Sequence, residues 1–87
     1  MHVITKKRLD EFAKKHPESK NALQIWYRII KNNNFKSFAE LKMYFSSSDM
    51  VKNLTVFNIG GNKVRLIASI HFNRGKVYSG YINSFRI

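Results

Sequence analysis

The 87-residue chain contains no cysteine, only one proline and no long hydrophobic run. The absence of cysteine excludes disulfide bridges, thiolate metal sites and thiol redox chemistry. No apolar stretch approaches the ~20 residues that a helix needs to cross a membrane. The short apolar pair near the N-terminus precedes the first lysines, which is the reverse of the order in a signal peptide, so we expect a cytoplasmic protein.

Acidic residues are also scarce. The chain has five aspartates and glutamates in total and 16 lysines and arginines, which gives a net charge of +11. No acidic residue follows Asp49. Such a charge favours phosphate-rich partners, either nucleic acid or an anionic membrane surface. The basic residues are dispersed among apolar ones, which favours a folded nucleic-acid binder over a membrane-surface module. The hydrophobic fraction of 44% suffices for a modest core, so we expect one small domain over residues 1–87.

The first half of the sequence has the periodicity of amphipathic helices. Residues 1–4 are β-prone and can add an edge strand, Thr5 is a suitable N-cap, and Pro17 ends the first helix. A second helix is predicted over 19–31, with Trp26 as a core residue and Tyr27 either in the core or stacked on a base. Ser37 and Glu40 have the spacing of a capping box before a short helix at 38–45.

The last third predicts three antiparallel strands. From residue 63 onward apolar side chains alternate with Lys63, Arg65, Ser69 and His71, and only Ile67 interrupts the polar row. Because a strand has side-chain period two, one face is apolar and the other cationic. The predicted fold class is therefore α+β, with two or three N-terminal helices packed on a small antiparallel sheet made of this C-terminal meander and the N-terminal strand.

Two glycine-containing turns set the predicted register. Gly60-Gly61 suits a two-residue turn that pairs Asn58 with Lys63. Arg74-Gly75 makes a second turn that pairs His71 with Tyr78. The residues gathered on the cationic face are then Lys63, Arg65, Ser69, His71, Lys76 and Tyr78.

This face has the groups that a metal-free ribonuclease needs: a proton acceptor for the ribose 2′-OH, positive charge at the phosphate, and a proton donor for the leaving oxygen. His71 can transfer protons near neutral pH. Arg65 and Lys63 are candidate phosphate clamps, and Tyr78 can donate a hydrogen bond or stack on a base. Further RNA contacts are predicted at Lys52, Asn62, Arg74 and Lys76, and no metal or cofactor is expected.

Each of these residues also has a purely structural explanation. Charged side chains on a strand often only deter edge-to-edge pairing. A histidine opposite a tyrosine is often a cross-strand packing pair.

The stretch 55–68, TVFNIGGNKVRLIA, resembles the central signature of HigB-type toxins in the RelE-like group of bacterial type II toxin–antitoxin systems. Further similarity lies at 1–4, 12–17, 26–28 and 38–42, so the resemblance covers about residues 1–78. It implies a RelE-like fold and a cytoplasmic bacterial endoribonuclease that cuts mRNA, commonly on translating ribosomes, and so inhibits translation. It implies neutralisation by a HigA-type helix-turn-helix antitoxin, with operator DNA bound only through the antitoxin. Arg65 matches the arginine that the group uses toward the scissile phosphate, and Lys63 matches a lysine on the same strand.

The resemblance weakens after Tyr78. Members of the family continue into a Thr-His-x-Glu-Tyr-Asp tail that supplies active-site groups, whereas residues 79–87 read SGYINSFRI and contain no histidine or acid. If the tail histidine moves a proton, its loss costs about 10²–10⁴ in rate. The sequence therefore leaves two hypotheses: an active toxin, and a catalytically weak or inactive remnant that binds RNA, ribosome or antitoxin without cleavage.

Overall fold

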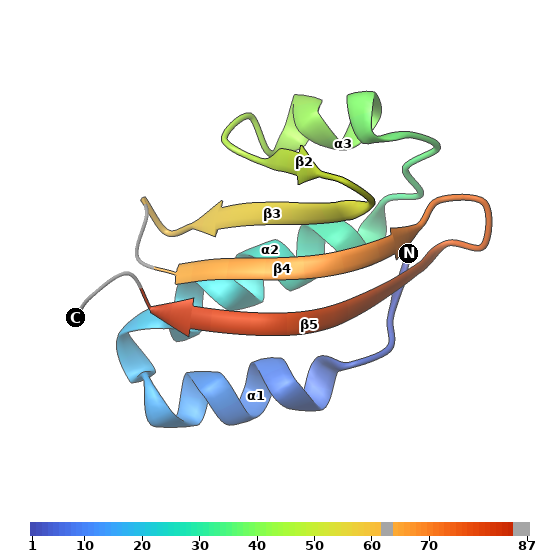
Figure 1. Ribbon diagram of the computed structural model, residues 1–87. Helices are drawn as coiled ribbons and strands as arrows, with labels where there is room; N and C mark the ends of the chain where they lie inside the picture. The colour runs from blue at the N-terminus through green and yellow to red at the C-terminus, as the bar shows by residue number, and fades with distance from the viewer. Residues whose placement is uncertain (62–63, 85–87) are drawn as a thin grey trace.

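Five strands form one mixed sheet in the computed structural model, which describes residues 1–61 and 64–84 (Figure 1). The strand order is β1-β5-β4-β3-β2, and every neighbouring pair is antiparallel except β1 with β5. The predicted α+β class and the added N-terminal strand are confirmed. The predicted sheet was antiparallel throughout, whereas β1 joins β5 in parallel and makes the sheet mixed. In chain order the elements are β1 (His2–Val3), α1 (Lys6–Lys15), the 3-10 helix η1 (Pro17–Ser19), α2 (Lys20–Asn32), α3 (Phe38–Tyr44), β2 (Asp49–Val51), β3 (Leu54–Ile59), β4 (Val64–His71) and β5 (Lys76–Ser84).

Helices α1 and α2 cover one face of the sheet. In Figure 1, α2 lies behind β3 and β4, and α1 runs beside β5. The apolar stripe of α2 is buried against the sheet, and Trp26, only 1% exposed, meets Phe57 of β3 edge-on at 5.3 Å between ring centroids. The prediction that Trp26 belongs to the core is therefore confirmed. No helix in the described part of the chain is both long and apolar enough to cross a membrane.

The start of α1 is coupled to the last strand. Thr5 occupies the N-cap position as predicted, but its side chain does not cap the helix. Its hydroxyl oxygen accepts a hydrogen bond from the backbone N–H of Ser79 at 2.7 Å and lies 3.4 Å from the Ser79 carbonyl oxygen. The side chain therefore links α1 to β5 across the whole sequence.

The predicted capping box is present at the start of α3. The backbone N–H of Glu40 donates to the Ser37 hydroxyl at 3.3 Å, and the Glu40 carboxylate accepts from the backbone N–H of Lys36 at 3.0 Å. We expect Ser37→Ala to lower the free energy of unfolding by about 1 kcal/mol, because it leaves a helix N–H without its acceptor. Urea denaturation measures the change, and Ser46→Ala in the adjoining exposed loop serves as the control. An equal effect of both substitutions would contradict the capping role.

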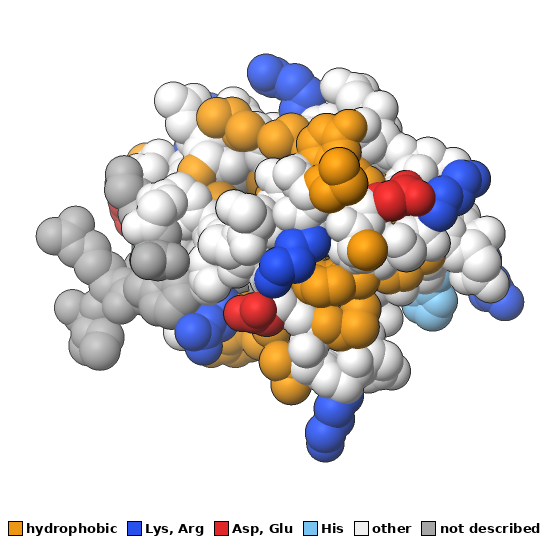
Figure 2. Space-filling view, turned by 90° about the horizontal axis from the view of Figure 1, so that it is seen from above, with side chains coloured by type: hydrophobic (Ala, Val, Ile, Leu, Met, Phe, Trp, Pro, Cys, Tyr) orange, Lys and Arg blue, Asp and Glu red, His pale blue; other side chains and the backbone are white. Residues whose placement is uncertain are grey.

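The edge of the sheet at α3 and β2 is largely apolar. Figure 2, which looks down on this edge, shows hydrophobic side chains gathered over it. The exposed ones are Met43 and Tyr44 of α3 and Met50 and Val51 of β2. Asp49–Val51 form strand β2, which pairs with β3 and leaves its other side as the sheet edge. A strand of only three residues offers little backbone for pairing with another chain.

Both predicted two-residue turns are wrong. The predicted assignment of side chains to the two faces of the sheet is nevertheless correct along β4. Ile59 pairs with Val64, so four residues connect β3 to β4. His71 pairs with Lys76, so four residues also connect β4 to β5. A four-residue connection keeps the same alternation as a two-residue one, because it moves the pairing by two positions. Phe57 therefore still lies on the buried face opposite Leu66.

A bulge in β5 changes which side chains face outward near the end of the strand. Ala68 pairs with Ser79, but Ile67 pairs with Tyr81, so Gly80 has no partner in the ladder. The extra residue reverses the alternation in the remainder of β5. Tyr81 consequently turns away from the core, and Ile82 lies opposite the fully buried Leu66 and packs against the core.

Candidate nucleic-acid interface

The sheet face turned away from α1 and α2, here called the outer face, carries the predicted site residues that the structure describes on strands. Along β4 the buried Val64, Leu66 and Ala68 alternate with outward residues, as the sequence predicted. The other two strands of the meander supply outward side chains in register with them. The outer face comprises Val56 and Asn58 of β3, Arg65, Ile67, Ser69 and His71 of β4, and Lys76, Tyr78, Tyr81 and Asn83 of β5.

One end of this face is centred on Arg65. Its exposed side chain lies on β4 between Asn58 and Asn83, its direct cross-strand partners. The Asn58 side-chain N–H donates to the Ser47 carbonyl at 3.2 Å, and the Ser47 hydroxyl donates to the Asn58 carbonyl at 3.3 Å. These bonds fix the Asn58 amide, whose own Oδ1 is buried with no hydrogen-bond partner among the described residues. A cationic guanidinium and an unmet acceptor therefore lie in one row.

The other end of the face is centred on His71. This residue pairs directly with Lys76, and its ring lies 5.2 Å from the Tyr78 ring in an edge-on arrangement. The predicted contact between His71 and Tyr78 is present although they are diagonal neighbours. The backbone N–H of Arg74 donates to the His71 carbonyl at 3.1 Å within the turn. All four side chains are exposed.

The structure does not bring Arg65 and His71 together. Six residues separate them along β4, which is about 20 Å at the rise of a strand. Proton transfer requires hydrogen-bond reach between the transferring group and the reacting atom. His71 and Arg65 therefore cannot act on the same phosphodiester in this arrangement.

An apolar and aromatic surface lies between the two ends. Ile67 is flanked by Val56 and by Tyr81, which is 51% exposed, and Tyr78 follows across the bulge. Exposed aromatic rings on a sheet are platforms on which bases of single-stranded nucleic acid stack. Tyr81 was not among the predicted site residues, because the alternation of side chains does not reveal the bulge that turns it outward. Asn58 was not predicted either, although it is a polar residue in the otherwise apolar run 56–59.

The remaining predicted residues lie elsewhere. Lys63 and Asn62 are outside the described residues. Lys52 is exposed in the turn between β2 and β3, at the opposite end of β3 from Asn58. It therefore does not join Arg65.

The largest concentration of positive charge is not on the sheet. Half of the chain's lysines and arginines are on the two helices that cover the buried face, and the outer face has only a few. Those on the helices are Lys6, Lys7, Arg8, Lys14 and Lys15 of α1 and Lys20, Arg28 and Lys31 of α2. Within residues 1–61 and 64–84, no three histidine, aspartate or glutamate side chains are grouped as metal ligands.

Known proteins match nearly the whole chain. Residues 19–86 match a family described as HigB_toxin, the RelE-like toxic component of a toxin-antitoxin system. The chain is 40% identical over 81 residues to "mRNA interferase toxin HigB" of Escherichia coli strain K12, which covers 90% of this chain and 78% of that protein. It is 33% identical over 87 residues to "mRNA interferase HigB" of E. coli O6:H1, with 97% and 84% covered. The family match continues past Tyr78, where the sequence alone indicated that the resemblance ends.

Proposed function

Because this chain belongs to the HigB family of RelE-like toxins, we propose that it is an endoribonuclease that cleaves mRNA. The relatives named mRNA interferases support this proposal, since they match most of the chain. The observation that carries it in the structure is the exposed Arg65 near one end of the outer face, the sheet face turned away from α1 and α2.

In the proposed mechanism a single strand of RNA lies along the outer face. Arg65 holds the scissile phosphate through its two-pronged guanidinium and stabilises the charge that builds up on it. The 2′-OH of the preceding ribose gives its proton to water and attacks that phosphorus. The bond from phosphorus to the 5′ oxygen breaks and water protonates the leaving oxygen, so the products are a 2′,3′-cyclic phosphate and a 5′-OH end. The exposed Asn83, the cross-strand neighbour of Arg65 on β5, can hydrogen-bond a ribose hydroxyl or a base edge. Tyr78 and Tyr81 stack on bases further along the strand.

The test is cleavage of a labelled single-stranded RNA by highly purified protein in the presence of EDTA. We expect products with 2′,3′-cyclic phosphate ends, because the ribose 2′-OH is the nucleophile. We also expect cleavage to be unaffected by EDTA, because no metal takes part in the proposed reaction. Loss of cleavage on adding EDTA would contradict the metal-free mechanism.

His71 is proposed to bind RNA and not to transfer a proton at the phosphate held by Arg65, because the two residues are about 20 Å apart along β4. We expect His71→Gln to raise the RNA concentration needed for half-maximal cleavage several-fold. The single-turnover rate at saturating RNA should stay within about threefold. A drop of 10²-fold or more in that saturated rate, as for loss of a general acid or base, would return His71 to the reaction centre.

The partners proposed for this toxin are a HigA-type helix-turn-helix antitoxin and the translating ribosome. Operator DNA is proposed to be bound only through the antitoxin, and the cytoplasm is the proposed location. The family description, which names a toxin-antitoxin system, supports the antitoxin.

One observation favours a second candidate function, binding of RNA without cleavage. The outward neighbours of Arg65 on β3 and β5 are Asn58 and Asn83, so neither strand offers it an acid or a histidine. This candidate predicts RNA binding whose log–log salt slope is about −0.7 per phosphate contacted, with no product formed. The EDTA-resistant cleavage assay separates the two functions.

A further inference from the structure

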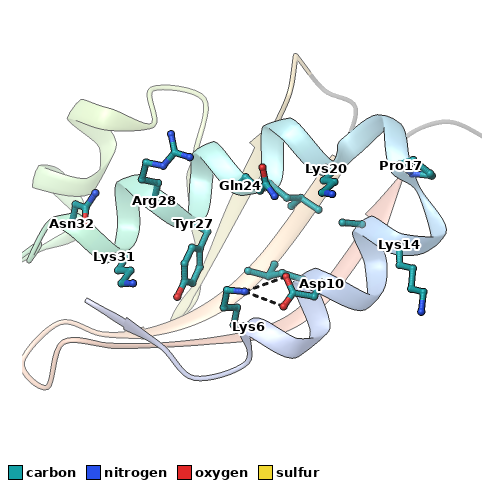
Figure 3. A pocket seen from close by; sticks show the side chains of 13 residues that line it. Lys6, Asp10, Lys14, Pro17, Lys20, Gln24, Tyr27, Arg28, Lys31 and Asn32 are labelled. Carbon is teal, nitrogen blue, oxygen red and sulfur yellow. Dashed lines mark hydrogen bonds and ion pairs between the residues drawn. The ribbon is translucent and has the colours of Figure 1, made fainter.

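A groove of about 910 Å³ runs between α1 and α2 (Figure 3). Its walls are the two helices and the η1 turn, and the strands pass behind them, so the groove opens on the opposite side of the molecule from the outer face. Its floor is the seam where Leu9 and Ala13 of α1 approach Leu23 and Tyr27 of α2.

Both walls of the groove have basic side chains. On each wall two of them are separated by one residue that adds no free positive charge, Asp10 on α1 and Gln24 on α2. The α1 wall has Lys6, Asp10 and Lys14, and the α2 wall has Lys20, Gln24 and Arg28, followed by Lys31. Lys6 and Lys14 are eight positions apart on α1, as are Lys20 and Arg28 on α2, and eight positions span about 12 Å along a helix. The only acid in the lining is already engaged: Asp10 forms an ion pair with Lys6 at 3.0 Å, and its carboxylate raises the pKa of the Lys6 ammonium by hydrogen bonding and Coulomb attraction.

The geometry favours a helix over RNA as the occupant. The space between two packed helices is complementary to a third cylinder of the same kind, whose side chains fill the seam. Single-stranded RNA would need a ring face on which to stack, and the one aromatic ring in the lining is that of Tyr27. The ammonium groups of Lys6 and Lys31 already lie over this ring, at 5.3 and 5.9 Å from its centroid.

We propose that the groove between α1 and α2 is the docking site for an acidic amphipathic helix of the antitoxin. The inference rests on the proposed function as the toxin of a toxin–antitoxin pair. Carboxylates on the two flanks of such a helix meet the lysine and arginine rows, and its apolar ridge covers Ala13 and Tyr27. A partner helix of opposite charge is complementary to the cationic walls of the groove.

A designed peptide can represent the partner helix. The probe is a fluorescent, helix-stapled peptide of about 20 residues, with leucines along one ridge and glutamates on both sides of it. We expect saturable binding to the full chain, with backbone NMR shifts confined to α1 and α2. The variant Lys14→Glu/Lys20→Glu should weaken binding by at least about tenfold. A peptide with lysines in place of the glutamates should bind that variant better than it binds the parent chain.

The matched control is Lys7→Glu/Lys15→Glu. It changes net charge by the same amount on exposed positions of α1 outside the groove lining. Equal loss of peptide binding in both variants would show that only long-range electrostatic attraction is at work, and would overturn the proposal. The absence of saturable binding would overturn it as well. Loss of RNA binding in the groove variant but not in the control would assign the groove to RNA instead.

The same two variants are assayed for RNA cleavage. Retained cleavage with lost peptide binding supports the docking site. Retained cleavage with unchanged peptide binding refutes the docking site alone, and absence of cleavage in the parent chain refutes the proposed enzymatic function alone.

Discussion

Arg65→Ala is expected to lower the rate of RNA cleavage by about 10²–10³-fold. This is the loss that follows removal of one preorganised group that stabilises developing charge. The substitution leaves the core intact, because the side chain is exposed while both of its neighbours along β4 are buried. Growth arrest on expression should disappear together with cleavage. The measurement is the single-turnover rate on a labelled RNA, with circular dichroism to verify the fold.

Two further arginine variants make this result specific. Arg65→Lys keeps the charge but loses the paired N–H donors, so we expect an intermediate rate. Arg28→Ala removes an exposed arginine from the groove between α1 and α2, on the other side of the molecule, and should leave cleavage of free RNA unchanged. If Arg65→Ala retained full activity, the outer face would not be the site of the reaction.

Trp26→Ala is expected to lower the free energy of unfolding by about 3–5 kcal/mol, because it opens a cavity between α2 and the sheet. A domain of this size has a total stability of about 5–15 kcal/mol, so the variant will be largely unfolded in mild denaturant. Urea titration followed by circular dichroism measures the loss. The neighbouring Ile25, which is 56% exposed, provides the control, since Ile25→Ala should change stability by less than about 0.5 kcal/mol.

Trp26→Phe separates packing from hydrogen bonding at the same position. The indole N–H is buried without a hydrogen-bond partner among the described residues. Phenylalanine removes this unmet donor and retains most of the ring area, so two opposing effects partly cancel. We expect a loss well below that of Trp26→Ala. Equal losses would show that the indole shape itself, and not burial of an aromatic ring, is required.

The helices and the meander were predictable because periodicity reports burial directly. In α2 the buried residues Leu23, Trp26 and Ile30 recur at helical spacing. The capping box at Ser37 was readable because it is a local arrangement of a few residues. In β4 the alternation of apolar and mostly polar residues identified both faces of the strand, and Arg65 lies on the exposed face as predicted.

The register and the site needed the structure. Two-residue and four-residue connections give the same alternation, so the pattern could not choose between them at 60–63 or at 72–75. The bulge at Gly80 depends on packing between strands, and it alone turns Tyr81 outward. Alternation also places Arg65 and His71 on one face without revealing that six residues of strand hold them about 20 Å apart. The alternation therefore predicted which side chains lie on the outer face, but not that the two ends of this face are too far apart to act on one phosphodiester.

The place of β5 in the sheet has a consequence for synthesis. This strand lies between β1 and β4, although the ribosome makes it after both. Until residues 76–84 have left the ribosome, the nascent chain has its helices and the β3–β4 hairpin but lacks β5. Without β5, strand β1 has no neighbour in the sheet. Premature stop codons before this point are therefore expected to yield no stable fragment, and the toxin matures only after translation has passed β5.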